Sequence, residues 1–269
     1  MDDFSLKLRM ANRLKVVFLG TGTSQGIPVI ACDCEVCQSV DPRDNRLRCS
    51  VLVSINDRNM VIDTGPDFRQ QMLAAKVKTL DAVLFTHEHK DHISGMDDIR
   101  AFNYAAEKPM EIFASYLVEI GLRREFHYVF GNNDYPGIPQ IHLNIIEDEP
   151  FEVIGEKVIP IDVMHYKLPV KAFRIRNFGY VTDANFIEES ELLKLKGVSH
   201  LVINALRKTP HISHFSLDEA LKIIELIAPK KAYLTHISHL MGLHAEVMKE
   251  LPENVQIAYD GLAIEIDEN

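Results

Sequence analysis

The sequence has little of what marks membrane, secreted or nucleic-acid-binding proteins. In 269 residues no apolar run approaches the ~20 residues that a membrane-spanning helix needs. Lysine and arginine total 29 against 39 aspartates and glutamates, and this formal net charge of −10 argues against broad electrostatic capture of nucleic acid or of an anionic membrane. Asp2 and Asp3 stand where a secretory signal would carry basic residues. These absences predict a cytoplasmic protein.

Cysteine is scarce as well, and three of the four cysteines lie close together. Cys32, Cys34 and Cys37 are too near one another to form an extracellular disulfide framework. Three thiolates on one short loop suit a structural zinc ion that takes a fourth ligand from elsewhere, for which His239 is the candidate; reduced, unpaired cysteines are the alternative. Cys49 lies in an apolar strand pattern and is predicted to be a buried thiol.

The chain otherwise has the composition of a folded α/β protein. Hydrophobic residues make up 46%, enough to bury a core, and repeats and low-complexity tracts are absent. No linker separates the halves, so we expect a single domain over residues 1–269. Expected strands cover residues 14–19, 50–55, 59–62, 80–85, 158–163, 173–175, 180–182, 201–204 and 232–234, and expected helices cover 66–76 and 217–227. This order predicts two mixed sheets packed face to face with helices outside.

The segment from Thr86 to His92 contains three imidazoles and two carboxylates directly after an apolar stretch. His87 and His89 alternate around one residue, so an extended backbone places both side chains on one side, while Asp91 and His92 can turn toward a second point. Imidazole with carboxylate suits Zn²⁺, Mn²⁺ or Fe²⁺ better than Ca²⁺ or Mg²⁺. The pattern therefore predicts a site for two metal ions, against the alternative of a chance cluster of surface histidines.

Three further candidate ligands follow predicted strands. His165 ends an apolar strand pattern, Asp183 follows residues 180–182, and His236 follows residues 233–235. Each of them alone would more often be an ordinary core or surface residue. Their joint placement at strand ends favours metal binding.

The motif from His87 to His92, with the three later residues, resembles the metallo-β-lactamase superfamily over essentially the whole chain. The resemblance implies a four-layer αββα fold with two packed mixed sheets. It implies one metal held by His87, His89 and His165, a second held by Asp91, His92 and His236, and Asp183 between them. Asp63 resembles the buried aspartate that supports the metal loop, here the segment from Thr86 to His92.

A narrower resemblance rests on residues 20–28, the cysteine loop and residues 235–239. Together they are similar to the cyclic-phosphate phosphodiesterases of phosphonate breakdown. In that subgroup a structural zinc is held by three cysteines and the second histidine of a T-H-x-x-H segment, here Cys32, Cys34, Cys37 and His239. An upstream histidine contacts the phosphate there; His214 matches it best, and His211 is the other choice.

The resemblance implies a metal-dependent hydrolase acting on a small phosphodiester, cyclic ones included, through a hydroxide shared by two zinc, manganese or iron ions. Asp91 and Asp183 are expected to position the nucleophile. His214 is expected to stabilise the phosphoryl oxygens or to protonate the leaving group. The chain lacks the Gly/Lys-rich arm of the transfer-RNA-processing branch, which favours a small substrate. Dimers are common among such relatives, so a homodimer is an open expectation, although no helix face can be assigned to an interface.

Other functions use the same fold. One alternative is an accessory protein similar to the pyrroloquinoline quinone biosynthesis protein B group, which shares the cysteine loop but departs from the full metal motif. Another is a lactonase or thioesterase, which needs the metals but not His214. A non-enzymatic binding module is least favoured, because the complete set of ligands is present.

Overall fold

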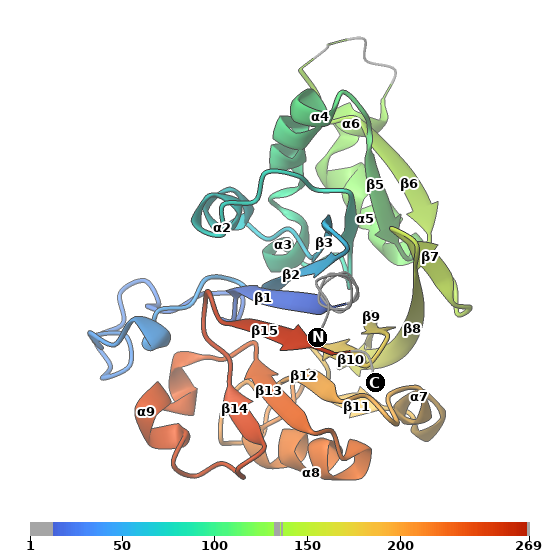
Figure 1. The fold of residues 1–269 in the computed structure, drawn as a ribbon. Helices are drawn as coiled ribbons and strands as arrows, with labels where there is room; N and C mark the ends of the chain where they lie inside the picture. The colour runs from blue at the N-terminus through green and yellow to red at the C-terminus, as the bar shows by residue number, and fades with distance from the viewer. Residues whose placement is uncertain (1–12, 132–134, 136, 268–269) are drawn as a thin grey trace, which may run out of the picture.

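Two mixed sheets packed face to face form the centre of the computed structural model, which describes residues 13–131, 135 and 137–267 (Figure 1). Asp2 and Asp3, which contributed to the expected location, lie outside these residues. Within the described part no helix has the length and apolar character needed to cross a membrane.

The first sheet has seven strands in the order β15-β1-β2-β3-β4-β5-β6. Their bounds are β1 Leu14–Gly20, β2 Ser50–Ile55, β3 Arg58–Ile62, β4 Ala82–Leu84, β5 Met110–Ala114, β6 Ile141–Ile145 and β15 Ala263–Ile266. The strands from β15 to β3 pair antiparallel, and those from β3 to β6 pair parallel. The β3 and β4 strands therefore end at the same edge, where the chain continues into residues 63–65 and 85–92.

The second sheet has eight strands, in the order β11-β8-β9-β10-β12-β13-β14 with β7 also paired to β8. Their bounds are β7 Phe151–Val153, β8 Glu156–His165, β9 Leu168–Ile175, β10 Phe178–Val181, β11 Phe186–Ile187, β12 His200–Asn204, β13 Lys231–Thr235 and β14 Val255–Ile257. The β10, β12, β13 and β14 strands are parallel, so β10 and β13 deliver Asp183 and His236 to one edge.

Three apolar cores hold four layers together. Between the sheets lie buried side chains such as Phe18, Phe173 and Tyr180. Helices cover the outer faces, with α2, α4 and α5 on the first sheet and α7, α8 and α9 on the second (Figure 1). The helices are α2 Phe68–Ala74, α3 Lys90–Ile93, α4 Arg100–Ala106, α5 Tyr116–Glu125, α6 His127–Phe130, α7 Glu189–Lys194, α8 Leu217–Ile227 and α9 His244–Val247, and the 3-10 turns are η1 Pro42–Asp44, η2 Met96–Ile99 and η3 His239–Met241. The four-layer αββα prediction is confirmed.

The expected strands and the helix over 217–227 are present, but the helix expected over 66–76 covers only Phe68–Ala74 and the strand expected over 80–85 covers only Ala82–Leu84. The helix expected from Pro66 begins at Phe68, because the Phe68 N–H donates to the Gly65 carbonyl and closes a turn that holds Pro66 before the helix. The sequence analysis did not predict α4, α5, β5 or β6, although β6 alternates apolar and polar residues as a strand does.

Two glycines let the metal loop lie against the end of β3. A Cβ at Gly65 would lie 2.2 Å from the carbonyl oxygen of Asp91, and a Cβ at Gly95 would lie 2.2 Å from that of Gly65. Both contacts involve backbone, which cannot rotate away. Glycine at these positions therefore permits the close approach that brings Asp91 to the sheet edge.

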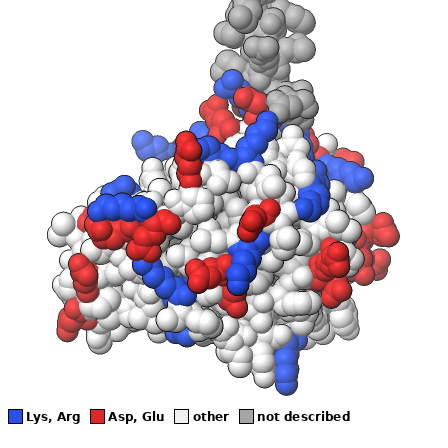
Figure 2. Space-filling view, turned by 90° about the horizontal axis from the view of Figure 1, so that it is seen from below, with Lys and Arg blue, Asp and Glu red and all other residues white. Residues whose placement is uncertain are grey.

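The surface carries both signs of charge. On the face shown in Figure 2, lysine and arginine side chains are interspersed with aspartate and glutamate. This mixture offers no broad single-sign field on that face.

Candidate metal centre

Asp63 fixes the conformation of the metal loop. It is fully buried just after β3, at a positive φ of 66°. The Thr86 N–H and hydroxyl donate to its two carboxylate oxygens at 2.9 and 2.8 Å, and His92 Nδ1 lies 2.7 Å from Oδ2. A carboxylate bonded in this way accepts, so His92 carries its proton on Nδ1 and presents Nε2 to the site.

Four of the predicted ligands converge beside this loop. The ligand atoms of Asp91, His92, Asp183 and His236 all lie within 4.8 Å of one another. His92 Nε2 is 3.2 Å from Asp91 Oδ2, and His236 Nδ1 is 3.2 Å from Asp183 Oδ2. Both nitrogens are buried without a hydrogen-bond partner among the described residues. Unpaired imidazole nitrogens facing carboxylates fit a bound divalent cation.

The charges around Asp91, His92, Asp183 and His236 also favour a bound cation. Burial opposes protonation of His92, but Asp91, Asp183 and Asp63 together outweigh it and raise its pKa well above the usual value. Burial would raise the pKa of Asp183, yet His236 and His92 hold it well below its usual value. The Asp183 carboxylate therefore stays ionised, and its charge needs compensation within the site.

The second predicted group is looser. His87 Nε2 lies 3.1 Å from His89 Nδ1, and the two rings are centred 5.8 and 5.1 Å from the ring of His165. The His165 Nδ1–H donates to the Ser213 carbonyl at 2.7 Å, which leaves Nε2 for a ligand role. The three imidazoles thus lie next to one another, but of the three only His165 belongs to a candidate ligand group, with Asp183 and His214.

His214 is buried within the site rather than exposed at its surface. It shares a candidate ligand group with His165 and Asp183, and its Nδ1 is 3.8 Å from Asp183 Oδ1 without a hydrogen-bond partner. Burial, followed by the neighbouring His236, lowers its pKa to about 3, so the ring is neutral. The geometry therefore admits metal binding as well as the predicted phosphate contact. His211 is only partly buried, accepts from the Ser213 N–H and is in neither group.

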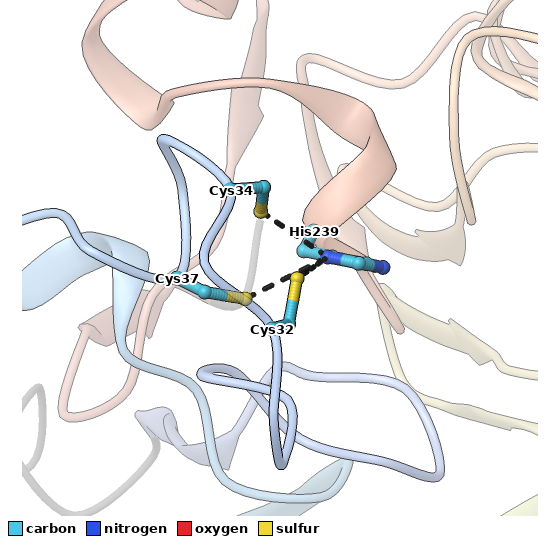
Figure 3. Close-up of side chains that lie close together, drawn as sticks. All are labelled: Cys32, Cys34, Cys37 and His239. Carbon is cyan, nitrogen blue, oxygen red and sulfur yellow. Dashed lines mark hydrogen bonds between the residues drawn. The ribbon is translucent and has the colours of Figure 1, made fainter.

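The four predicted zinc ligands converge on one point (Figure 3). His239 Nδ1 lies 3.3 Å from the sulfurs of Cys32 and Cys34 and 3.6 Å from that of Cys37. A zinc ion with bonds of about 2.3 Å to sulfur and about 2.0 Å to nitrogen would hold such atoms about 3.5 Å apart in a tetrahedron. The donor set and its spacing therefore fit a structural zinc. Cys49 is a buried thiol away from this loop, as predicted.

The two sites share one short segment, since His236 and His239 are separated by two residues. The Ile237 N–H donates to the Thr21 carbonyl at 2.9 Å, and the Thr23 N–H donates to the Ile237 carbonyl at 3.0 Å. Thr23 Oγ1 also lies 3.3 Å from His236 Nε2. Thr23 and the Ser213 carbonyl orient candidate ligands, and no pattern in the sequence assigned them that role.

Comparison with known proteins agrees with this geometry. A family model described as the beta-lactamase superfamily domain matches residues 58–237, a span that includes the candidate ligands from His87 to His236. The chain therefore belongs to the metallo-β-lactamase superfamily, whose fold implies divalent metal ions. A solved structure described as a new diphosphatase from the PhnP family is 38% identical with a TM-score of 0.89, over 95% of this chain and 98% of that one. Within the superfamily the chain belongs to the PhnP family, which confirms the narrower resemblance.

Two other relatives are similar to this chain over part of their length or in fold alone. The octanoyltransferase of Porphyromonas gingivalis (strain ATCC BAA-308 / W83) is 40% identical over 259 residues, which are 95% of this chain and 52% of that protein. The chain spans about half the length of the curated relatives it matches. The zinc-bound PqqB of Methylobacterium extorquens has a TM-score of 0.75 at 18% identity, over 93% of this chain and 99% of that one, and shows the fold alone.

We predict that Asp63→Asn weakens metal binding. An amide NH₂ would face donors at Thr86 or His92, so His92 would lose the bond that fixes its proton on Nδ1. Zinc affinity, measured by competition with a chromophoric chelator, should fall about 10- to 100-fold. Asp148→Asn, at a side chain 82% exposed, is the control. Equal affinity of both variants would contradict the role of Asp63.

A second prediction concerns the cysteine loop. Cys37→Ser should lower the zinc content by about one ion per chain and reduce the melting temperature, because a structural zinc contributes directly to folding. Cys49→Ala, at a cysteine outside the cluster, should keep the zinc. Plasma mass spectrometry after dialysis gives the count, and identical zinc content in the two variants would exclude the site.

Proposed function

We propose that the protein hydrolyses a small phosphodiester. One observation supports phosphorus over carbon as the reacting centre: the relative that is 38% identical along nearly the whole chain is described as a diphosphatase. The set of ligating side chains at the sheet edge and the additional histidine, His214, are consistent with that chemistry. A net charge of −10 and the interspersed surface charges support a small substrate rather than a nucleic acid.

The chain offers ligands for two divalent ions at the strand ends of the two sheets and for one more at the cysteine loop. The proposed ligands are His87, His89 and His165 for one ion, Asp91, His92 and His236 for the other, Asp183 between them, and Cys32, Cys34, Cys37 and His239 for a structural zinc. Bound divalent ions in such a site stabilise charge on phosphoryl oxygens and lower the pKa of water. Zinc, manganese and iron all suit the active-site donors.

The protein groups then have distinct tasks. Asp91 and Asp183 hold the attacking water through their carboxylate oxygens and orient it toward phosphorus. A new P–O bond forms from this water while the P–O bond to the departing alkoxide breaks, and a proton ends on the departing oxygen. Asp63 holds the metal loop, and with it Asp91 and His92, in place through its hydrogen bonds to Thr86 and His92.

His214 is assigned to the phosphoryl group. A neutral imidazole carries one N–H, which can donate to a phosphoryl oxygen as negative charge develops there. Its burial beside Asp183 supports this placement, because a hydrogen bond made away from bulk water is stronger than one at the surface.

The cytoplasmic location and the homodimer expected from the sequence stay predictions.

A diphosphate ester is the second candidate substrate. The description of the 38% identical relative as a diphosphatase favours it directly. Each phosphorus of an internal P–O–P link has a diester-like set of oxygens, so the same residues could act and a phosphate would replace the alkoxide as leaving group.

The alternatives from other classes have weaker support. The name octanoyltransferase belongs to a protein about twice as long as the match, so it does not assign acyl chemistry to the matched half. The match to PqqB concerns the fold. A lactonase or thioesterase would use the same metals without need of His214.

We expect metal-loaded protein to cleave bis-p-nitrophenyl phosphate and to leave the monoester p-nitrophenyl phosphate nearly intact. Asp91→Ala should lose about 100-fold or more in kcat/KM, since a ligand and a water-holding carboxylate are removed together. Asp148→Ala is the surface control. ADP-ribose, which contains a P–O–P bond, tests the second candidate. Failure on every phosphorus substrate by protein with full metal content would refute the proposal.

His214→Ala separates phosphate contact from metal binding. We expect turnover of the diester to fall about 100-fold or more while metal content stays at the wild-type level. His142→Ala, at an exposed histidine beside Glu111, is the matched control. Metal content measured on the same samples decides the matter, because loss of an ion in His214→Ala would make this residue a ligand instead.

A further inference from the structure

Three large exposed apolar side chains lie within three residues of candidate metal ligands in the sequence. Tyr166, Phe186 and Ile212, here named the apolar rim, are 51%, 52% and 67% exposed. Tyr166 directly follows His165, Phe186 lies three residues after Asp183, and Ile212 lies two before His214. Exposed apolar groups on the loops that carry a site's ligands are candidates for ligand binding.

Hydrogen bonds tie the three rim loops together. The Tyr166 N–H donates to Asn185 Oδ1 at 2.6 Å, and the Asn185 N–H donates to the Met164 carbonyl at 2.8 Å. The His165 Nδ1–H donates to the Ser213 carbonyl, next to Ile212. These bonds join the loops that carry the rim residues, and the one to Ser213 also orients His165.

Strand pairing places Phe186 on the face of the second sheet that looks toward the first sheet. Phe186 pairs with Met164, so both lie on one face. Val158, an even number of residues before Met164 on β8, packs in the core between the sheets, whereas Val163 packs in the core under the helices. The Lys171 N–H also donates to the Thr86 carbonyl at 3.0 Å, which joins this sheet to the metal loop.

The rim also carries a positive charge. The Lys167 ammonium lies 5.3 Å from the centre of the Tyr166 ring. Two flat aromatic rings and an aliphatic side chain, with a cation beside them and metal ligands behind them, suit a flat apolar group joined to a phosphate.

We infer that the apolar rim is the subsite for a planar aromatic ring carried by the substrate on the group that remains attached to phosphorus. This inference rests on the proposed phosphodiesterase function. It adds a specificity: phosphodiesters with a ring-bearing substituent are preferred over those with a small alkyl substituent, because the ring stacks on Tyr166 and Phe186.

Three p-nitrophenyl phosphodiesters test the subsite, with phenyl, methyl or n-hexyl as the second substituent. All release the same p-nitrophenolate. We expect the phenyl-to-methyl ratio of kcat/KM to fall about five- to tenfold from wild type in Tyr166→Ala and in Phe186→Ala. Intrinsic reactivity cancels because each ratio is compared with wild type. Phe186→Leu should behave as Phe186→Ala does, and Phe186→Tyr should retain the preference.

Controls and a binding measurement keep the inference separate from the proposed function. Leu226→Ala, at an α8 side chain that is 53% exposed, should leave the ratio at the wild-type value. Titration calorimetry with phenylphosphonate and methylphosphonate measures ring recognition without turnover. Tighter binding of phenylphosphonate that is lost in the rim variants would support the subsite even if no diester were cleaved.

Two outcomes would overturn the inference. Wild-type ratios in both alanine variants, or equal binding of the two phosphonates by wild type, would remove the rim from substrate recognition. An equal loss for n-hexyl and phenyl esters would show that the rim takes apolar groups in general rather than planar rings.

Discussion

The buried carboxylate of Asp63 is the constraint on which the rest of the site depends. It lies at a strand end without exposure to water, and it accepts hydrogen bonds from the Thr86 N–H, the Thr86 hydroxyl and His92. A buried charge is tolerated only when it is paired in this way. The same three bonds that satisfy Asp63 set the path of the metal loop and leave His92 Nε2 free to bind a cation.

Around that anchor the fold gathers ligands that are far apart in the chain. Parallel strands end at a common edge, so β3, β4, β10 and β13 bring together side chains from Asp63 to His236. The resulting cluster of unpaired nitrogens and carboxylates would be unfavourable without a cation, and binding of divalent ions offsets that cost. The cysteine loop adds a second anchor, because His239 continues from His236 and residues 21–23 pair with the segment between them.

Much of the site was predictable because its chemistry is local in sequence. The spacing of His87, His89, Asp91 and His92 after a strand predicts a metal motif, and three cysteines within six positions predict a zinc-binding loop. The same local reading failed where contacts are distant. It had no means of finding that His214 lies beside Asp183, because that distance depends on loops from different strands.

By itself the sequence determined the layered α/β class, the two groups of candidate metal ligands and the acidic balance of the chain, because hydrophobic period, ligand type and charge are properties of neighbouring residues. Tertiary structure decided which nitrogen each histidine presents, how closely His165, Asp183 and His214 approach, and where the exposed rings of Tyr166 and Phe186 stand. Those features arise from packing between strands distant in the chain, and local sequence patterns contain no information about such distances.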